Sequence, residues 1–456
     1  MAISSVGAGS GVLTQDILDQ LREADSSQYI TPLELSIANE NDKKQALKII
    51  DANMTNLEDG INALKDPALF NERSATITGT SVEVTAAIMS DIQEFTLEVT
   101  NLATKQIEQS AAFDNADIES ISATDGQIEL SIDGQIFQID YTAGTTLNGL
   151  KSLINDVAGE KVDATVVQIG DTDFRLFISS VDTGENQGIS ITNTIGTIDP
   201  RLSDGVGGLT EIQAGTNANF KFNGQDIVRE SNNVSDLIVG LDITLKEVGT
   251  SNVSIGQNRE TIMEKIDSFI SHYNAAIIEL GKMTKSSLDS EERGIFSGDS
   301  TIRGMKSTIE NMVASTTSGS MFDFGFELDR NGVLSVDKDA LTTQLDDNNA
   351  NVIAFFIGGT YTNPDLTTTE LTGAFTEFAT KVDAYTKYDA TLDQFKNSIT
   401  DAISMYEDRK LTATERLDSK YETLKKKFIA YDIMMSKFNS ASSMFTQMAN
   451  AAADSN

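Results

Sequence analysis

Two segments near opposite ends of this 456-residue chain carry apolar side chains at alternating steps of four and three residues. This spacing puts them on one face of a helix and is typical of helices that bury a seam against other helices, as in a coiled coil. The stripe near the C-terminus comprises Leu417, Tyr421, Leu424, Phe428, Tyr431, Met435, Phe438 and Phe445. The stripe near the N-terminus comprises Ile30, Leu33, Ile37, Leu47, Ile50, Met54, Leu57, Ile61 and Leu64. The matching pattern predicts that the two ends pack together and that the middle of the chain is a long insertion.

The charge of the two ends is opposite, which favours this packing. Residues 1–60 hold ten acidic and four basic side chains, whereas residues 409–437 hold eight basic and four acidic ones. Exposed ion pairs contribute only about 0–1 kcal/mol each, so charge alone would not hold the ends together. The whole chain has a net charge of −35, which argues against nucleic-acid binding because phosphate recognition needs clustered Lys and Arg.

Several residue types that carry chemistry are scarce or missing from the sequence. The chain has no Cys, which excludes disulfide and thiol chemistry, and a single His, His272, which we expect to be a packing or surface residue because it has no second His as a partner. No apolar run reaches the ~18–20 residues of a membrane span. The first residues lack the basic start and apolar core of a cleaved secretory signal. With 69 acidic residues, carboxylate pairs are expected by chance, so no enzyme, metal site or cofactor is predicted.

Helical periodicity covers both ends of the chain and much of its second half. The first helix is expected over about residues 12–65, with Pro32 in a first helical turn and Asp66-Pro67 ending the run. Further helices are predicted over about residues 259–283, 299–314, 340–356 and from 374 to the end, with a polar loop over 360–372. Phe355-Phe356 is expected to belong to a core and not to an exposed partner surface.

Residues 76–255 instead alternate with the two-residue period of β-strands. Asp133-Gly134 and Asn223-Gly224 are typical of tight hairpin turns. The first turn predicts that Leu130 faces Phe137 and that Ile128 faces Ile139. The second hairpin is expected to contain Phe220 and Phe222 before its turn and Ile227 after it. A short helix is expected over 147–157 and a glycine-rich linker near 200–208.

Two glycine-containing segments have tempting alternative interpretations. The leader Gly7–Gly11 resembles a phosphate-binding loop, but no strand precedes it and no Gly-Lys-Ser/Thr follows, so a flexible leader before a helix is favoured. The segment Asp329–Gly332 could suggest a calcium loop, but the spacing is wrong and no closing Glu follows. A hairpin turn with Asn331-Gly332 is the preferred interpretation.

Four motifs, in order along the chain, resemble those of the flagellar filament cap proteins, the flagellar hook-associated protein 2 family. They are SVGAGSG at residues 5–11, SNNVSDLIVGLDITL at 231–245, GIFSGDSTIR at 294–303 and FGFELDRNGVLSVD at 324–337. Each motif alone is weak, but four in family order, covering both halves of the chain, are jointly specific. Residues 112–211 match only loosely, and residues 144–157 look like a module that also occurs in flagellar hook and flagellin proteins.

The resemblance implies an elongated α+β fold, in which paired N- and C-terminal coiled-coil-like helices form a leg or stalk and two β-rich head domains are inserted. The implied domains are a leg of residues 1–42 and 415–456, a helical stalk of 43–75 and 258–414 with small strands, a β-rich head of 76–115 and 212–257, and a second β-rich head of 116–211. The C-terminal stripe is expected to pack the legs, with Leu47, Met54, Leu57, Ile61 and Leu64 opposite it.

The resemblance also implies a structural role outside the cell. The family caps the distal end of the filament as a homo-oligomeric ring, for which a pentamer is favoured here, and promotes folding and insertion of exported flagellin while preventing its loss. The implied partners are other copies of the chain, flagellin, the hook–filament junction proteins, the flagellar type III export machinery and a cytosolic export chaperone. An alternative is a surface adhesin that uses the acidic β-rich head, and swimming and attachment of a deletion strain would separate the two roles.

Overall fold

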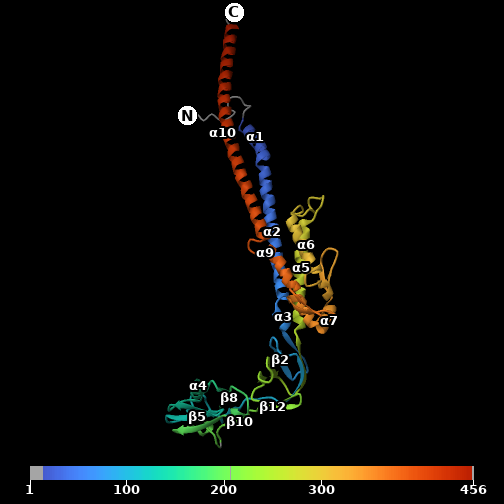
Figure 1. Cartoon of the computed structure of the whole chain (residues 1–456). Coiled ribbons are helices and arrows are strands. Elements are labelled where there is room, and N and C mark those ends of the chain that lie inside the picture. The colour runs from blue at the N-terminus through green and yellow to red at the C-terminus, as the bar shows by residue number, and fades with distance from the viewer. Residues whose placement is uncertain (1–13, 206, 454–456) are drawn as a thin grey trace. The chain divides into compact units, whose positions relative to one another are not determined.

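The computed structural model describes residues 14–205 and 207–453. The glycine-rich leader Gly7–Gly11 lies outside the described residues. The described chain divides into two compact units, of which the first contains both ends of the chain and the second is the inserted segment from Pro67 to Thr261 (Figure 1). Each unit is described below by itself. Helices and strands occur together as predicted, with long helices at both termini, so the α+β class is confirmed.

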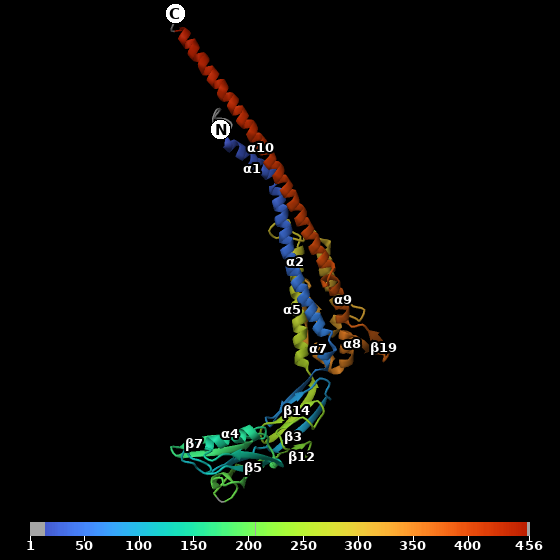
Figure 2. The same ribbon diagram turned by 90° about the vertical axis from the view of Figure 1, so that its left-hand side faces the viewer.

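The first unit is built around long helices from both ends of the chain. They are α1 (Gln15–Tyr29), α2 (Thr31–Leu64) and α10 (Thr391–Ala453). Figure 2 shows α1 and α2 running beside α10. The sequence predicted one helix over 12–65, whereas the structure has a break at Ile30. Pro32 lies in the first turn of α2, as predicted, and the break follows because proline has no N–H to continue a helix from the preceding residues.

The rest of the first unit combines further helices with two short hairpins. They are nearly all of α5 (Arg259–Thr284), then α6 (Ser300–Ala314), η3 (Met321–Phe324), β16 (Phe326–Leu328), β17 (Leu334–Val336), α7 (Lys338–Asp347), α8 (Asn349–Ile357), β18 (Gly359–Thr362), β19 (Thr368–Leu371) and α9 (Ala374–Thr386). Aromatic side chains form much of their core. The Phe269 ring meets the edge of Phe375 at a centroid distance of 5.0 Å, and Phe355 and Phe356 are buried, as predicted.

Three predictions for this unit need correction. Residues 360–372 are not a loop but the hairpin β18–β19, which Asn351 fixes by accepting from the Thr362 N–H at 2.8 Å and donating to the Thr362 carbonyl at 2.9 Å. The helix predicted over 340–356 is interrupted at Asn348. The C-terminal helix is interrupted between α9 and α10, where Asp389 has a left-handed backbone with a φ of 59°. The turn predicted at Asp329–Gly332 does join β16 to β17.

One part of the second unit is a pair of small sheets over a shared apolar core. The elements are α3 (Pro67–Asn71), β1 (Arg73–Thr78), β2 (Val82–Ala86), β3 (Gln93–Asn101), β11 (Ala218–Phe222), β12 (Gln225–Arg229), β13 (Asn233–Val234), β14 (Leu241–Leu245) and β15 (Gly249–Gln257). The strand orders are β1-β15-β3-β11-β12 and β13-β14-β2. The second predicted hairpin is confirmed, because Phe220 pairs with Ile227 across β11 and β12.

The other part of the second unit has its own core, with α4 packed on two further sheets. The elements are β4 (Ile107–Gln109), β5 (Gly126–Ile132), β6 (Gln135–Tyr141), α4 (Leu147–Ala158), β7 (Val162–Gly170), β8 (Asp173–Ser180), η1 (Glu185–Gln187), β9 (Ser190–Ile195), η2 (Pro200–Leu202) and β10 (Thr210–Gln213). The strand orders are β10-β4-β8-β7 and β6-β5-β9. The predicted pairs Leu130–Phe137 and Ile128–Ile139 are both present in the register of β5 and β6.

The tight turn between β5 and β6 explains why this register was predictable. Asp133 and Gly134 both have positive φ angles, 49° and 66°, as a two-residue type I′ turn requires. The helix predicted over 147–157 is also present, as α4, and the Thr146 side chain caps it by accepting from the Gly149 N–H.

The expected linker near 200–208 is corrected by the structure. Its first part is the short helix η2, and the Leu202 side chain is fully buried in the surrounding core. Arg201 holds the segment in place by donating to the carboxylates of Asp199 and Glu119, each at 2.6 Å. The four-part domain division stays a prediction.

Candidate assembly surface on the terminal helices

The C-terminal helix α10 packs antiparallel to the N-terminal helices through oppositely charged side chains. Lys410 pairs with Glu34 of α2 at 2.7 Å, and Lys420 pairs with Asp25 of α1 at 2.6 Å, so residue numbers rise along α10 as they fall along its partners. Arg22 and Asp418 form a further ion pair. These ion pairs confirm that the opposite charges of the two ends face each other.

Asp25 is the polar centre of the α1–α10 contact. Its carboxylate accepts hydrogen bonds from Lys420 Nζ and from the Tyr421 hydroxyl, the latter at 2.8 Å. The hydrogen bond from Lys420, followed by that from Tyr421, holds the pKa of Asp25 below its usual value, and the same bond raises the pKa of Lys420. The arrangement fixes the register of α10 against α1.

The first half of the C-terminal stripe packs within the chain. Leu417 and Tyr421 are buried together with Leu18 and Ile30, which α1 and the break before α2 contribute. Leu424 and Phe428 are partly buried against the same cluster. The sequence did not single out Leu18, because continuing the spacing of the N-terminal stripe back from Ile30 does not reach it.

The second half of the stripe is exposed in the described chain. Phe438 and Phe445 are 69% and 72% exposed, and Tyr431 and Met435 are about half exposed. Between them α10 also exposes Met434. Such a run of large apolar side chains on one helix face is unusual on a soluble surface and marks an interaction site. These residues are the candidate assembly surface, defined as Tyr431, Met434, Met435, Phe438 and Phe445.

The N-terminal residues expected opposite this stripe lie elsewhere, inside the first unit. Leu47, Met54, Leu57, Ile61 and Leu64 are all buried. Their surroundings are α5, α9 and the start of α10. The Thr386 hydroxyl donates to Glu58 at 2.8 Å, and a Cβ on Gly60 would approach the Phe269 Cα at 3.1 Å. The structure therefore does not bring the two predicted sets of residues face to face.

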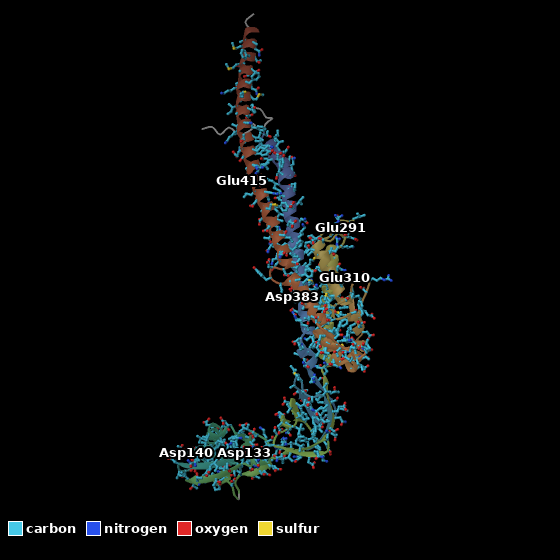
Figure 3. All side chains as sticks on the ribbon, in the orientation of Figure 1. Asp133, Asp140, Glu291, Glu310, Asp383 and Glu415 are labelled. Atoms are coloured by element: carbon cyan, nitrogen blue, oxygen red, sulfur yellow. The ribbon has the colours of Figure 1, made fainter. Side chains whose placement is uncertain are left out.

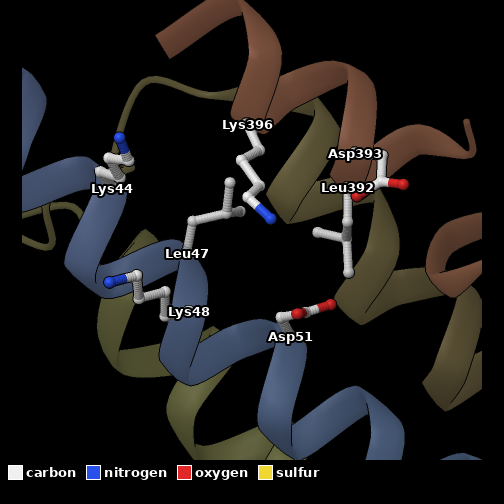
Figure 4. Close-up of a pocket in the computed structure, with 7 residues that line it drawn as sticks. All are labelled: Lys44, Leu47, Lys48, Asp51, Leu392, Asp393 and Lys396. Atoms are coloured by element: carbon white, nitrogen blue, oxygen red, sulfur yellow. The ribbon is translucent and has the colours of Figure 1, made fainter. Parts of the chain in front are cut away.

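A small hollow between α2 and α10 also shows that Leu47 lies opposite the start of α10 and not opposite the C-terminal stripe. Leu47 and Leu392 extend toward it from the two helices, together with Lys396 and Asp51 (Figure 4). Its volume is about 30 Å³, which is room for a water molecule and not for a substrate.

Other candidate sites from the sequence have structural roles. Asp329 Oδ1 accepts from the N–H groups of Asn331 and Val333, both at 2.8 Å, so this carboxylate serves the turn. The lone His272 is partly buried on α5 beside Gly60. Acidic side chains are spread over both units, for example Asp133 on the second and Glu310 on the first (Figure 3). Among the described residues no group of His, Asp and Glu could hold a metal ion.

In the part of the chain that the structure describes, no helix combines the length and apolar character needed to cross a bilayer.

Comparison with known protein families gives two matches on this chain. Residues 215–440 match the sequence model described as "Flagellar hook-associated protein 2 C-terminus", and residues 10–106 match "Flagellar hook-associated protein 2 N-terminus". The matched segments include both members of the α1–α10 pair.

Individual relatives agree with the family matches. The flagellar hook-associated protein 2 of Escherichia coli K12 is 25% identical over 98% of both chains, and that of Aeromonas caviae is 24% identical over 97% of both. The protein of the same name from Campylobacter jejuni is 26% identical over 78% of this chain, which spans 64% of that longer relative. None of these names supports an adhesin.

A solved structure resembles the fold. The crystal structure of the D1-D2-D3 domains of the flagellar cap protein FliD from Escherichia coli superimposes with a TM-score of 0.57 at 22% identity, and covers 78% of this chain and 99% of that one. At this identity the likeness establishes the fold, and the function has to be argued from the family and from the surface.

Proposed function

The chain belongs to the flagellar hook-associated protein 2 family, and from this premise we propose that it caps the distal end of a bacterial flagellar filament as a ring of identical copies. The family consists of structural cap proteins. In this role the chain promotes folding and insertion of exported flagellin and prevents its loss. The observation that carries the proposal for this chain is the candidate assembly surface on α10.

The proposal assigns the two halves of the C-terminal stripe different tasks. The half from Leu417 to Phe428 holds α1 and α10 together in one leg. The half from Tyr431 to Phe445 packs against other copies of the chain in the ring. Burying a Phe side chain contributes about 1.5–3 kcal/mol, so the exposed residues together supply the free energy of a stable contact.

Net charge explains why an apolar surface is needed. Copies of a chain with a charge of −35 repel one another at long range. The basic stretch 409–437 on α10 lowers this repulsion locally, because it carries twice as many basic as acidic residues. Legs that meet through α10 therefore bring together the least acidic segments of the copies, and a pentameric ring is the stoichiometry we propose.

The proposal extends to location and export. A cap acts outside the cell, at the tip of the flagellum, and reaches it through the flagellar type III export machinery with the help of a cytosolic chaperone. Before filament growth it meets the hook–filament junction proteins. A chain with no Cys and four Pro suits passage in an unfolded state, since refolding then needs no disulfide formation and few proline isomerisations.

The test is a charge substitution on the exposed half of the stripe. The double variant Phe438→Asp with Phe445→Asp should weaken self-association at least about a hundredfold, measured by sedimentation velocity, and should stop filament growth in a complemented deletion strain. Its thermal stability should match that of the wild type, because both side chains are already exposed in the single chain.

The matched control is Ile433→Asp on the same stretch of α10. Ile433 is also exposed, but it lies about 140° around the helix from Phe438, so it should leave association and filament growth unchanged. Normal motility and association in the double Phe variant would overturn the proposed function of this surface.

A further inference from the structure

The methionines of this chain differ widely in exposure, and the exposed ones include Met89 in the second unit, Met405, and a group near the end of α10. Of thirteen in the sequence, Met54, Met305 and Met321 are fully buried in the first unit. The last part of α10 instead exposes four: Met434, Met435, Met444 and Met448. Met434 is 65%, Met435 46% and Met444 62% exposed, values that leave their sulfur atoms open to small reagents in water.

Helix geometry places these exposed methionines differently around α10. With about 100° per residue, Met434 and Met435 lie about 40° and 60° on either side of Phe438, so they flank the centre of the candidate assembly surface. Met444 lies about 120° from Phe438 and outside the apolar face. Two exposed methionines of one helix are therefore on the surface that packs, and a third with similar exposure is not.

We infer that Met434 and Met435 are a peroxide-sensitive modification site whose oxidation weakens the packing of α10 against neighbouring subunits. The inference rests on the proposed function, because it states that oxidation regulates the packing surface proposed there. The site is open while the chain is dispersed and closes once neighbouring subunits cover it.

The chemistry is a two-electron oxidation with hydrogen peroxide as the co-reactant. The thioether sulfur forms a bond to one peroxide oxygen while the O–O bond breaks. The departing hydroxide takes the proton of the transferred hydroxyl group and leaves as water. The sulfur is oxidised to a sulfoxide and the peroxide is reduced.

The consequence follows from the polarity of the product. A methionine sulfur is a soft apolar group that fills irregular gaps between helices. A sulfoxide oxygen is a strong hydrogen-bond acceptor, and burying it on an apolar helix face without a donor is unfavourable. Oxidation at Met434 and Met435 should therefore oppose packing, whereas oxidation at Met444 adds a polar group to a face that already meets water.

The first experiment maps oxidation on the full-length chain, dispersed and self-associated, with dilute hydrogen peroxide and peptide mass spectrometry. In the dispersed chain Met434, Met435 and Met444 should oxidise at similar rates, while Met54 and Met305 are protected by the fold. Association should slow oxidation of Met434 and Met435 at least about fivefold and leave Met444 unchanged. Equal rates at Met434 and Met435 in both states would overturn the inference.

The second experiment measures the effect of oxidation on self-association. Peroxide treatment of the wild type should weaken association about tenfold or more. The variant Met434→Leu with Met435→Leu should associate normally and resist this effect, although its Met444 still oxidises. The mimic Met435→Gln should weaken association, and Met444→Gln should not.

The outcomes separate this inference from the proposed function. If Phe438→Asp with Phe445→Asp abolishes association but peroxide weakens the wild type and the double Leu variant equally, the oxidation site is refuted and the surface stands. If the Phe variant associates normally, the packing surface and the oxidation site are both refuted.

Discussion

A buried carboxylate in the second unit gives a sharp test of the electrostatics of this fold. Glu108 of β4 is 7% exposed and lies directly across from Glu211 of β10 in the antiparallel register. Gln106 bridges the pair by donating from Nε2 to Glu108 at 2.6 Å and to Glu211 at 3.2 Å. Burial, opposed in part by the Gln106 hydrogen bond and aided by the charges of Glu211 and Asp204, raises the pKa of Glu108.

The sign of the pH dependence follows from this raised pKa. The folded protein keeps the Glu108 proton to a higher pH than the unfolded chain, whose pKa is near 4.5. The contribution of this group to the free energy of unfolding is therefore greatest below that value and is lost as the pH rises through the folded pKa. Above the folded pKa, the buried charge that Glu108 acquires destabilises the β4–β10 contact.

Replacing Glu108 by Gln should remove this cost while keeping the shape of the side chain. The new amide can donate to Glu211 and still accept from Gln106, so a like-charge cross-strand pair becomes a hydrogen-bonded one. The substitution relieves a cross-strand repulsion worth about 0.2–1 kcal/mol and also reduces the desolvation penalty. We therefore expect the local free energy of unfolding to rise by about 1 kcal/mol near pH 7 and to change very little near pH 4.

Hydrogen-exchange mass spectrometry of the β4 and β10 peptides measures this gain locally. At neutral pH the variant should exchange about fivefold more slowly than the wild type under identical conditions, and the ratio should approach one in acid. Glu247→Gln is the matched control, because it makes the same charge change at an exposed position between β14 and β15. Faster exchange in the Glu108 variant, or the same ratio at both pH values, would refute the reasoning.

Two further predictions concern the first unit, and thermal melting of the full chain measures both. Leu57→Ala removes a fully buried side chain and should cost about 2–5 kcal/mol, whereas Leu35→Ala on the exposed side of α2 should cost under about 0.5 kcal/mol. Gly373→Ala should lower the free energy of unfolding by more than about 1 kcal/mol, because the φ of Gly373 is 94° and the new Cβ would lie 2.3 Å from the Ile357 carbonyl carbon. Gly298→Ala is the control and should be tolerated, because the space around Gly298 is open.

Local chemistry explains which parts of the fold the sequence revealed. The hairpin at Asp133-Gly134 was predictable to the residue pair, and the position of the hairpin at Asn223-Gly224 was predictable too. Each turn contains residues that accept a positive φ, and the strands alternate on both sides. The place of Pro32 in a first helical turn was predicted for a similar reason, although the break just before it was not. In each of these places a few neighbouring residues determine the structure.

The errors occurred where side-chain hydrogen bonds from a neighbouring helix decide the local structure. The hairpin β18–β19 lacks alternating apolar residues, and it forms against Asn351 of α8, which binds both polar groups of the Thr362 backbone. No Gly or Pro near Asp389 predicts the break in the helix there. There Gln394 Nε2 donates to the Asp389 carbonyl, and the Thr391 hydroxyl donates to the Ala384 carbonyl. Contacts of this kind have no signature in the periodicity of a single segment.

The assembly surface shows a further limit of prediction from the sequence. A heptad stripe predicts that a helix face will be buried, but it does not indicate which segment or which molecule will bury it. Leu417 is only 6% exposed because Leu18 and Ile30 cover it, while Phe445, in the same register of the same helix, is 72% exposed.

Antiparallel pairing explains the change along the stripe. Each step further along α10 needs a partner one step earlier in α1, and the described part of α1 begins at Gln15, which lies beside Lys425. Beyond that point the described part of α1 offers α10 no further cover, although the apolar spacing continues. The apolar spacing therefore continues beyond the cover that the described residues supply, and the exposed Phe438 and Phe445 are the residues on which the proposed contact with other copies depends.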